Sequence, residues 1–590
     1  MSPPRRQRVA ANSVYNPSVP SARVTLLVLL CVLTFFVGLG RPAITDSDEA
    51  FYAQAAHEMV EGGDWLTPHY NGQFRFEKPV LYYWFVALAY LATGVGEMAA
   101  RLPSALAGLV LVLTTYACGR RWYDETTGFL AGAITATSFG YVAVARQALP
   151  DLALAAFITL GTWAALVALV TPRPVGPDPQ RRWWLLGAGA ALAGAVLTKG
   201  PVGVVLPAIV VGPLALWRCW SERASRPGDA KEPLVRLALD VGLLTLACLL
   251  LAVPWFAAMT TTHGVAYLER FFIDENVQRF ATIRYNAPRP LWYYLPIVAG
   301  GLLPWSPFML VWWQPIRRLA QRARHLRPVE IWLAVWTLMP WLFYTLSTGK
   351  QPRYILPVLP PLAILLARAV SRRLAGQDPP EQKPPRDHLL AAAGAISGSV
   401  LVLLGVLLYR AQPLLLGVSP AMVLVGSVLL AVSGLGVSLV AFSARQRLIP
   451  VAVVIGSVLA TLTAQYITLS RPGAEPVQEM SALLRAAGAE TIPYGRYRVF
   501  VRNLVFYTGR PHVDLSSQEQ VQAFLESSEP VLCVLAEEDL RLARAHGVTA
   551  HELGRVEYLN TGSLTIRTLV WPDSSTDLET VVLVTNRPPP

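Results

Sequence analysis

Long apolar stretches recur along this chain from residue 24 to residue 469, and short segments between them carry most of the charge. A helix needs about 20 apolar residues to cross a bilayer, and many of these stretches approach that length. Inside lipid the backbone must satisfy its own hydrogen bonds, which strings this long and apolar achieve only as helices. The sequence therefore predicts an α-helical polytopic membrane protein and excludes a transmembrane barrel.

The net charge of +12 could point to a nucleic-acid partner. However, the Lys and Arg residues lie in short clusters between the apolar stretches, where they decide which loops stay in the cytoplasm. We therefore expect membrane lipid around this chain and no nucleic acid.

The number of crossings depends on residues 79–96, PVLYYWFVALAYLATGVG, which are barely long enough to span and are rich in Tyr and Trp. If they cross, Arg120 and Arg121 fall outside, and so do the basic loops after residues 170 and 218. Because basic loops prefer the cytoplasm, we expect an interfacial helix in the first outer loop. About thirteen transmembrane helices then remain, near 24–40, 101–119, 126–143, 151–170, 183–198, 201–218, 236–258, 291–313, 330–348, 354–370, 388–409, 419–443 and 448–469.

Arg5, Arg6 and Arg8 precede the first apolar stretch, as they would in a signal peptide. No small-residue cleavage motif follows at a convincing distance, so we expect an uncleaved first span with a cytoplasmic N-terminus. An odd number of crossings then places the C-terminal tail on the outer side of the membrane.

The composition changes after residue 470, which predicts a membrane domain over 1–470 and a small α/β domain outside the membrane over 471–590. The patterns predict helices at SALLRAAG, VQAFLE and EEDLRLARAHG, a buried strand at PVLCVLAE, and alternating strands at RYRVFVRNLVFYT. The final stretch, WPDSSTDLETVVLVTNRPPP, allows no assignment.

Three acids, Asp46, Asp48 and Glu49, follow the first span within TDSDEAFYAQAAHEM. Carboxylates crowded at a bilayer surface repel each other, so they either form a solvated cap or handle a cation, a proton or a positively polarised carbon. Asp48 precedes a helical pattern, and Asp151 follows Pro150 at the start of a span, so each is also suited to cap a helix N-terminus.

Several basic residues fall on the same outer side at span ends, where charge is costly and often marks a functional cavity. Taken singly, the lysines could extend toward water, and His263 is a lone loop histidine. Taken together with the acids, they suit an anionic headgroup whose phosphate leaves, and an acceptor hydroxyl whose proton goes to Asp48 or Asp151. The cations that could stabilise the phosphate are Lys78, Lys199, Arg146, Lys350 and Arg353.

A family resemblance adds to this interpretation. The segments DEAFYAQAAHEM, GDWLTPHYNGQFRFEKPVLYYW, ARLPSALAG, LTKGP and GKQPRYILP, over roughly residues 24–370, resemble the bacterial transferases that move 4-amino-4-deoxy-arabinose from undecaprenyl phosphate to lipid A. More broadly, they resemble the glycosyltransferase type C superfamily, which includes the protein mannosyltransferases. The combination of an early Asp-Glu after the first span with GDW and FEKP is specific to this group, and each piece alone is weak.

The resemblance implies an enzyme of the bacterial cytoplasmic (inner) membrane with a periplasmic active site, a polyprenyl phosphate-linked sugar donor and a lipid or glycan acceptor. Asp48 and Asp151 match the acids of the first two outer loops, with Glu49 beside the first. Lys78, Lys199 and Arg146 match positions expected near the donor phosphate. Tyr52 and Tyr354 would line the cavity. No cofactor is required, although Glu77 and His263 could match a pair that holds zinc in some members; two ligands alone are too few to define a zinc site.

This chain departs from the family pattern in having Ser47 before its Asp-Glu pair and Val80 after FEKP. A mannosyl- or hexosyltransferase acting on protein or on a cell-wall polymer is the main alternative. A lipid or sugar transporter should show paired halves with broken helices, and no such repeat is visible. A membrane scaffold would explain the tail and leave the one-sided cluster of charges without a role.

Overall fold

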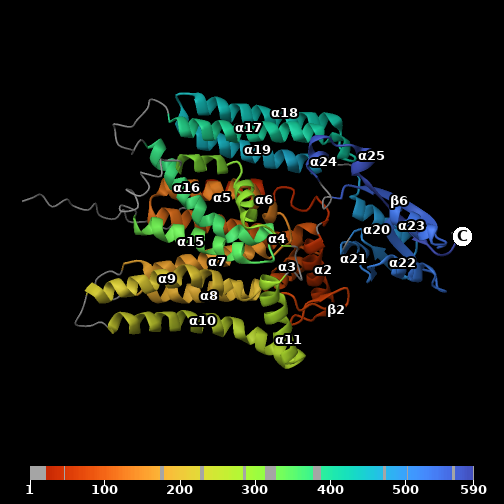
Figure 1. The fold of residues 1–590 in the computed structure, drawn as a ribbon, viewed down its shortest axis with the longest axis horizontal. Coiled ribbons are helices and arrows are strands. Elements are labelled where there is room, and N and C mark those ends of the chain that lie inside the picture. Colours follow the sequence, from red (N-terminus) through yellow and green to blue (C-terminus); the bar gives the residue numbers. More distant parts are fainter. Residues whose placement is uncertain are drawn as a thin grey trace, which may run out of the picture.

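The long helices lie side by side in a bundle, and a unit built on a β-sheet adjoins one end of it (Figure 1). The computed structural model describes residues 22–45, 47–172, 178–225, 231–282, 288–312, 327–375, 387–469, 473–500, 502–560 and 565–588. The arginines of the N-terminal segment and Asp46 therefore lie outside the described residues.

Among the described residues, nine helical segments are long and apolar enough to cross a membrane, and two bent pairs raise the number to as many as eleven. This confirms the predicted multi-pass helical fold, although the count of thirteen is not reached. The nine are α4 (Glu97–Trp122), α7 with η2 (Asp151–Val170), α9 (Val202–Ser225), α10 (Glu232–His263), α15 (Pro328–Leu346), η7 with α16 (Pro352–Leu374), α17 (His388–Arg410), α18 (Pro420–Phe442) and η10 with α19 (Gln446–Ile467).

Two predicted crossings are bent. α5 (Glu125–Thr137) meets α6 (Phe139–Ala145) at 60°, and the segment Leu291–Gly301 meets η6 (Ser306–Trp312) at 106°. The other two differ in length or composition: α1 with η1 (Ala22–Phe36) is shorter, and α8 (Arg181–Lys199) begins with two arginines, ends with a lysine and is rich in Gly and Ala.

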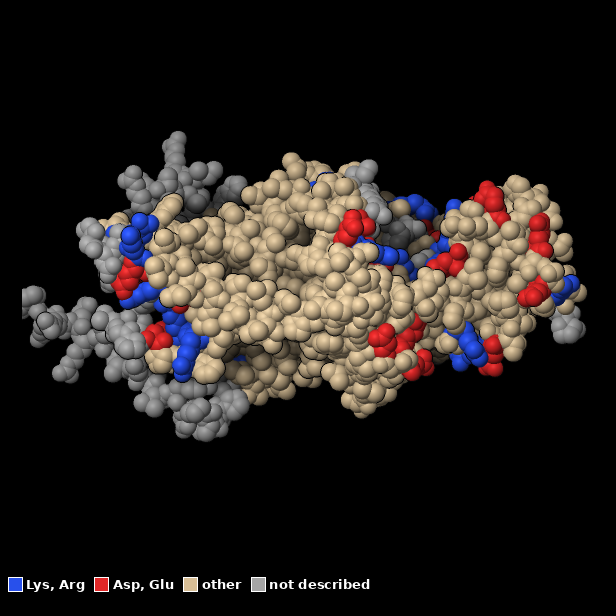
Figure 2. Space-filling view, turned by 90° about the horizontal axis from the view of Figure 1, so that it is seen from below, with Lys and Arg blue, Asp and Glu red and all other residues tan. Residues whose placement is uncertain are grey.

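Charged side chains are unevenly distributed over the surface of the bundle. Around the middle of the bundle the visible face carries no Lys, Arg, Asp or Glu, whereas charged side chains gather toward both ends (Figure 2). A belt without charge is what a bilayer core requires.

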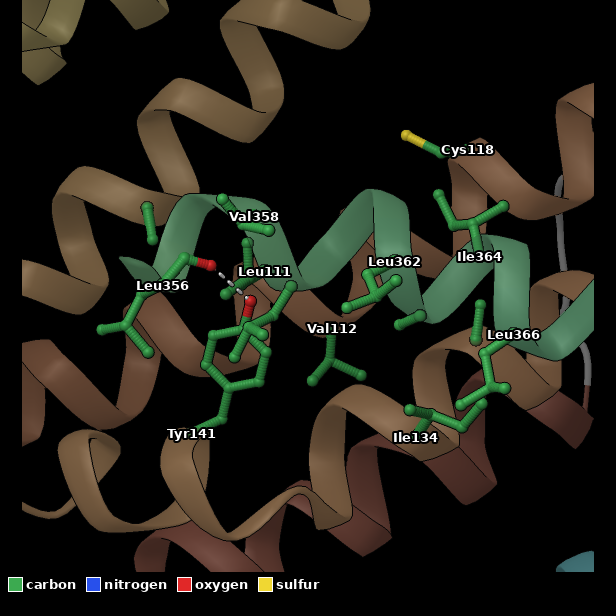
Figure 3. Packing of buried hydrophobic residues seen from close by; sticks show 14 of the residues in the cluster. Leu111, Val112, Cys118, Ile134, Tyr141, Leu356, Val358, Leu362, Ile364 and Leu366 are labelled. Carbon is green, nitrogen blue, oxygen red and sulfur yellow. Dashed lines mark hydrogen bonds between the residues drawn. The ribbon is translucent and has the colours of Figure 1, made fainter. Parts of the chain in front are cut away.

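Close packing holds the bundle together. Tyr141 on α6 is buried and donates a hydrogen bond from its hydroxyl to the Leu356 carbonyl of η7 at 2.9 Å, among aliphatic side chains of α4, α5 and α16 (Figure 3). Between α17 and α18 the backbones touch, since a Cβ on Gly398 would lie 2.3 Å from the Gly434 carbonyl oxygen. Small residues permit such close helix contacts in membranes, where no hydrophobic force drives helices together.

Between the bundle and the sheet lie α2 (Ser47–Gly62), the hairpin of β1 (His69–Tyr70) and β2 (Gln73–Phe74), and α3 (Leu81–Thr93). With 13 residues, α3 is shorter than the roughly 20 that a crossing needs, in line with the predicted interfacial helix.

The C-terminal unit contains one five-stranded mixed sheet in the order β4-β3-β5-β7-β6. β3 runs parallel to β4 and β5, while β7 runs antiparallel to β5 and β6. Its strands are β3 (Tyr494–Tyr497), β4 (Val513–Leu515), β5 (Leu532–Ala536), β6 (His551–Tyr558) and β7 (Glu579–Thr585), and its main helices are α20 (Pro476–Ala486), α21 (Leu504–Thr508), α22 (Gln518–Leu525) and α23 (Glu537–Ala545).

The three predicted helices and the strand at PVLCVLAE are confirmed, whereas the strand prediction for RYRVFVRNLVFYT is largely wrong. β3 ends at Tyr497, and LVFYT forms α21. Arg498, Phe500 and Arg502 all have positive φ angles, 62°, 45° and 73°, which an extended strand cannot accommodate. The unassigned final stretch supplies β7, an interior strand of the sheet.

Candidate active site

A polar cavity of about 370 Å³ lies where the bundle, the first outer loop and the C-terminal unit meet. Residues from widely separated parts of the chain line it, and they include acids and bases in close contact. The lining residues are Asp48, Phe51, Tyr52, Arg75, Glu77, Lys78, Leu149, Asp151, Lys199, Glu275, Arg279, Gln351, Arg353, Tyr354 and Arg502.

An apolar groove of similar volume, about 370 Å³, continues from this cavity. Its remaining lining is mostly aliphatic and aromatic, with Leu154, Val205, Phe272, Ile273 and Val277 among its members. The two spaces share a set of lining residues that we call the seam: Lys78, Asp151, Lys199, Glu275, Arg279, Arg353 and Tyr354. A ligand with a charged head and a long apolar tail could lie across the seam.

Asp48 lies in the first turn of α2 and faces the polar cavity, with 39% of its side chain exposed. Its Oδ2 accepts a hydrogen bond from Arg353 Nη2 at 2.5 Å, and its Oδ1 lies 3.4 Å from Arg502 Nη1. Two arginines from distant parts of the chain thus hold this carboxylate at the cavity wall.

Asp151 begins α7, and Lys199 ends α8. Lys199 Nζ donates to Asp151 Oδ1 at 2.5 Å and lies 4.7 Å from the centroid of the Tyr354 ring. Both charged side chains are nearly buried, with Asp151 7% and Lys199 13% exposed, so each offsets much of the cost of burying the other.

Lys78 precedes α3, and its Nζ donates to the Glu77 carbonyl at 2.9 Å. Among the described residues no carboxylate forms a salt bridge with it. Burial, together with the nearby Arg279 and Lys199 cations, lowers the pKa of Lys78 to about 7. An anion arriving at the seam would remove that penalty by pairing with the ammonium group.

One segment that lines the site was not predicted from the sequence. It follows α10 and includes the π-helix η4 (Arg270–Gln278) and α12 (Arg279–Ala281). Arg279 Nη2 pairs with Glu275 Oε2 at 2.7 Å, and both side chains line the seam. An acid and a base at i and i+4 within FFIDENVQRF, beside an outer span end, was the available signal. π-Helical turns are frequent at functional sites.

Two further arginines were missed, and they enclose one aromatic ring. Arg75 Cζ lies 3.7 Å from the centroid of Phe51, and Arg502 Cζ lies 3.8 Å from it. Arg75 also donates from Nε to the Tyr83 hydroxyl at 2.7 Å. Arg502 belongs to the C-terminal unit, so that unit contributes a residue to the cavity wall. Tyr52, as predicted, lines the same wall.

Glu49 does not line either space, which corrects its prediction as a catalytic residue. Its side chain is 3% exposed and accepts from Arg101 Nε at 2.7 Å and Nη2 at 3.1 Å. Glu49 Oε1 also accepts from the Ala148 amide at 2.9 Å, while Arg101 binds three backbone carbonyls of residues 39–43. Its role is to fix the start of α2 against α4.

Two predicted phosphate ligands also lie away from the cavity. Lys350 donates to the carbonyls of Ser347 at 2.6 Å and Arg289 at 3.2 Å, and so ties together two loops. Arg146 donates to the carbonyls of Phe35 and Val37 beside a different crevice. The positions of Lys350 and Arg146 in the sequence predicted that both lie at the outer face, but they did not predict the direction of either side chain.

Glu77 lines the polar cavity, whereas His263 Nε2 lies 2.8 Å from Thr67 Oγ1 and packs against Phe74 and Phe76. Among the described residues no group of three or more His, Cys, Asp and Glu side chains could hold a metal ion. Glu77 and His263 alone do not fit the four-ligand shell that zinc prefers.

The sequence and the fold are both similar to those of known glycosyltransferases. Residues 26–264 match the family model described as dolichyl-phosphate-mannose-protein mannosyltransferase. The undecaprenyl phosphate-alpha-4-amino-4-deoxy-L-arabinose arabinosyl transferase of Pseudomonas paraeruginosa is 36% identical over 360 residues, which are 60% of this chain and 60% of that protein. The enzyme of the same name from Aeromonas salmonicida is 32% identical over 342 residues, 58% of each chain. The resemblance to these transferases is confirmed.

The match covers about 60% of the length of these curated relatives. A solved structure extends the comparison to nearly the whole chain. The crystal structure of ArnT from Cupriavidus metallidurans bound to undecaprenyl phosphate is 22% identical, with a TM-score of 0.69 over 96% of this chain and 99% of that one. This likeness establishes the fold, including the C-terminal unit.

Proposed function

We propose that this protein is an integral membrane glycosyltransferase that moves a sugar from a polyprenyl phosphate donor to an envelope acceptor. One observation carries the proposal: a polar cavity and an apolar groove meet at a seam lined by Lys78, Lys199 and Arg279. A lipid-linked sugar phosphate has the same three parts in the same order, with a sugar, an anionic link and a long hydrocarbon chain.

The donor would bind with its phosphate at the seam. Lys78 forms no salt bridge with a carboxylate among the described residues, and Lys199 lines the same seam. Hydrogen bonds from cations to phosphate are strong, and in a site screened from water they also stabilise charge that develops during reaction. The isoprenoid chain would follow the groove past Val205 and Val277.

In the transfer step, the bond between the anomeric carbon and the phosphate oxygen breaks, and its electron pair stays on that oxygen. The acceptor oxygen bonds to the anomeric carbon from the opposite face, so the configuration inverts. Where the acceptor is a hydroxyl, its proton passes to the Asp48 carboxylate. The developing oxocarbenium character is that of glycosyl transfer in general, and the seam cations balance the charge of the leaving polyprenyl phosphate.

We propose 4-amino-4-deoxy-L-arabinose as the sugar because the arabinosyl transferases above are named for it. A feature of the cavity supports an amino sugar. Glu77 Oε2 is buried and lines the polar cavity with its carboxylate; among the described residues it accepts no hydrogen bond, and its ion pair with Arg75 Nε is long, at 3.9 Å. An ammonium group on the sugar would supply a donor there. Lipid A is the acceptor that this assignment suggests.

We propose that the cavity opens on the periplasmic side of the bacterial inner membrane. Arg120 and Arg121, which are expected in the cytoplasm, lie in the last turn of α4. Glu97 in the first turn of the same helix accepts hydrogen bonds from Gln478 and Tyr507 of the C-terminal unit, so the two arginines are at the other end of α4. Cysteines introduced singly at exposed positions of α23 should react with an impermeant thiol reagent in intact spheroplasts, whereas cysteines beside Arg121 should not.

Transfer by the purified protein in vesicles tests the function. Undecaprenyl phosphate-linked aminoarabinose and polyprenyl phosphate-linked mannose should be offered separately, with lipid A or a peptide as acceptor, and products read by mass spectrometry. Transfer of aminoarabinose to lipid A supports the proposal. Transfer of mannose to peptide favours the protein mannosyltransferase, which the family match over residues 26–264 makes the second candidate. No transfer from any polyprenyl phosphate donor contradicts both.

A further inference from the structure

A second crevice, of about 390 Å³, lies among α6, α17, α18 and α19, and no residue that lines it also lines the polar cavity or the apolar groove. Its walls are largely aliphatic, with Val142, Leu404, Leu408 and Leu430 among them. Leu404 and Leu408 of these walls are only partly buried, and Leu403 and Val406 on the same helix are more than 45% exposed, so the crevice lies near the outer surface of the bundle.

Arg146 provides the single cationic group in the described lining of this crevice. It follows the end of α6, and its Nη1 donates to the carbonyls of Phe35 at 3.2 Å and Val37 at 2.8 Å. With the Gln465 amide oriented so that its nitrogen donates to the Val37 carbonyl, its oxygen accepts from Arg146 Nη1 at 3.0 Å.

The partners of Arg146 are neutral. Among the described residues no carboxylate forms a salt bridge with it, in contrast to Arg101, Arg279 and Arg353. Burial, with the Arg101 cation nearby, lowers the pKa of Arg146 to about 10, so the group stays charged at neutral pH. A half-buried cation at a membrane edge is costly, and the neutral oxygens that Arg146 binds satisfy its N–H groups without balancing its charge, which an anion would do.

The position of the crevice in the bundle favours an anionic lipid over a small soluble anion. Arg146 lies between α6 and α7 a few residues before Asp151, and Gln465 lies in the last turn of α19, so the charged end of the crevice is at the same end of the bundle as the polar cavity. An anionic lipid of that leaflet would place its phosphate on Arg146 and an acyl chain against Leu404 and Leu408.

We propose that Arg146 and the crevice among α6, α17, α18 and α19 bind an anionic phospholipid of the outer leaflet, at a site separate from the donor site. The site requires nothing of the transfer reaction, and only its assignment to the outer leaflet rests on the proposed periplasmic orientation.

Lipid retention tests this site. The full-length protein, purified in detergent and supplied with phosphatidylglycerol or phosphatidylethanolamine, should retain phosphatidylglycerol preferentially in native mass spectrometry. Arg146→Gln should weaken phosphatidylglycerol binding about tenfold or more, and Arg146→Lys should keep part of it. Arg410→Gln is the matched control, because Arg410 is an exposed cation at the same end of α17 and does not line the crevice.

A second variant keeps the test informative if Arg146→Gln does not fold. Leu408→Trp would fill the aliphatic part and leave the cation in place, and it should also weaken phosphatidylglycerol binding. Equal retention of the two phospholipids by the wild type, or unchanged retention by Leu408→Trp, would overturn the proposal. Competition by undecaprenyl phosphate for the same bound lipid would instead reassign the crevice to the donor and equally overturn it.

Discussion

The polar cavity and the apolar groove have about the same volume and share the seam, yet their other walls are opposite in character. The cavity adds Asp48, Arg75 and Arg502, whereas the groove adds aliphatic and aromatic side chains from α9, η4 and α15. The charged side chains that line these two spaces belong to the cavity and the seam. A ligand with a polar head and an apolar tail would therefore meet charge only around its head.

Asp48→Asn should lower turnover about 100-fold or more, because it removes the carboxylate that faces the cavity while keeping its shape. Initial rates on saturating donor, with thermal unfolding measured in parallel, check this. The melting temperature should stay close to that of the wild type.

Glu49→Gln is the matched control for Asp48→Asn, one residue away. Breaking a buried ion pair by removing one partner typically destabilises a protein by about 3–5 kcal/mol, and Glu49 pairs with the buried Arg101. This variant should therefore lose folded protein first. A stable Glu49→Gln with normal folding and a defect only in turnover would contradict the division between the two acids.

Lys78→Ala should weaken donor binding about tenfold or more, because the seam loses the cation that lacks a carboxylate partner. The wild type should also bind donor more weakly as pH rises. A phosphodiester keeps its charge throughout, and it binds the protonated Lys78, whose pKa is about 7 in the empty protein. Above that pH each unit should lower donor affinity by up to about tenfold, until the higher pKa of the bound state is reached.

Lys78→Arg separates charge from other effects of pH, because an arginine stays protonated over this range. Equilibrium binding of donor at pH 6 to 9 should show a steep dependence for the wild type and a shallow one for Lys78→Arg. Equal slopes for the two proteins would rule out Lys78 as the titrating group.

Val205→Trp should block the groove and raise the KM for a long-chain donor several-fold. A donor with a short, water-soluble chain should be used as before, since its sugar and phosphate do not reach Val205. Leu216→Trp, on the exposed side of the same helix α9, is the control and should leave both KM values unchanged. A KM that rises equally for both donors would mean that the groove does not hold the chain.

Arg502→Gln should have the smallest effect, lowering turnover only a few-fold. Its contact with Asp48 is 3.4 Å, longer than the 2.5 Å contact of Arg353, and partly exposed ion pairs contribute about 1 kcal/mol or less. Comparing kcat and KM for Arg502→Gln and Arg353→Gln checks the order. A larger loss for Arg502→Gln would show that the C-terminal unit has a greater part in the reaction than its geometry indicates.

Much of the site could be predicted from the sequence because its charges stand at span ends, where the cost of burial makes them conspicuous. Asp48, Lys78, Asp151, Lys199 and Arg353 were all predicted in this way, and the cavity includes every one. The same rule also selected Arg146, Lys350 and Glu49, because distance from a span end does not reveal the direction of a side chain or the presence of a buried partner.

The residues that were missed share a different property. Glu275 lies in the π-helix η4, and Arg279 follows it in α12. Arg502 belongs to the C-terminal unit, whose contact with the cavity depends on the packing of the whole chain. Positive φ angles around Arg502 ended the predicted strand and turned its side chain toward Asp48. Neither the periodicity of a segment nor its composition carries that information.

A structure of this protein with bound undecaprenyl phosphate would show whether the donor phosphate lies at the seam. We expect phosphate oxygens within about 3 Å of the Lys78 and Lys199 ammonium groups, with the isoprenoid chain along the groove past Val205. A phosphate bound at Arg146, or a chain that leaves the protein by another route, would contradict this expectation.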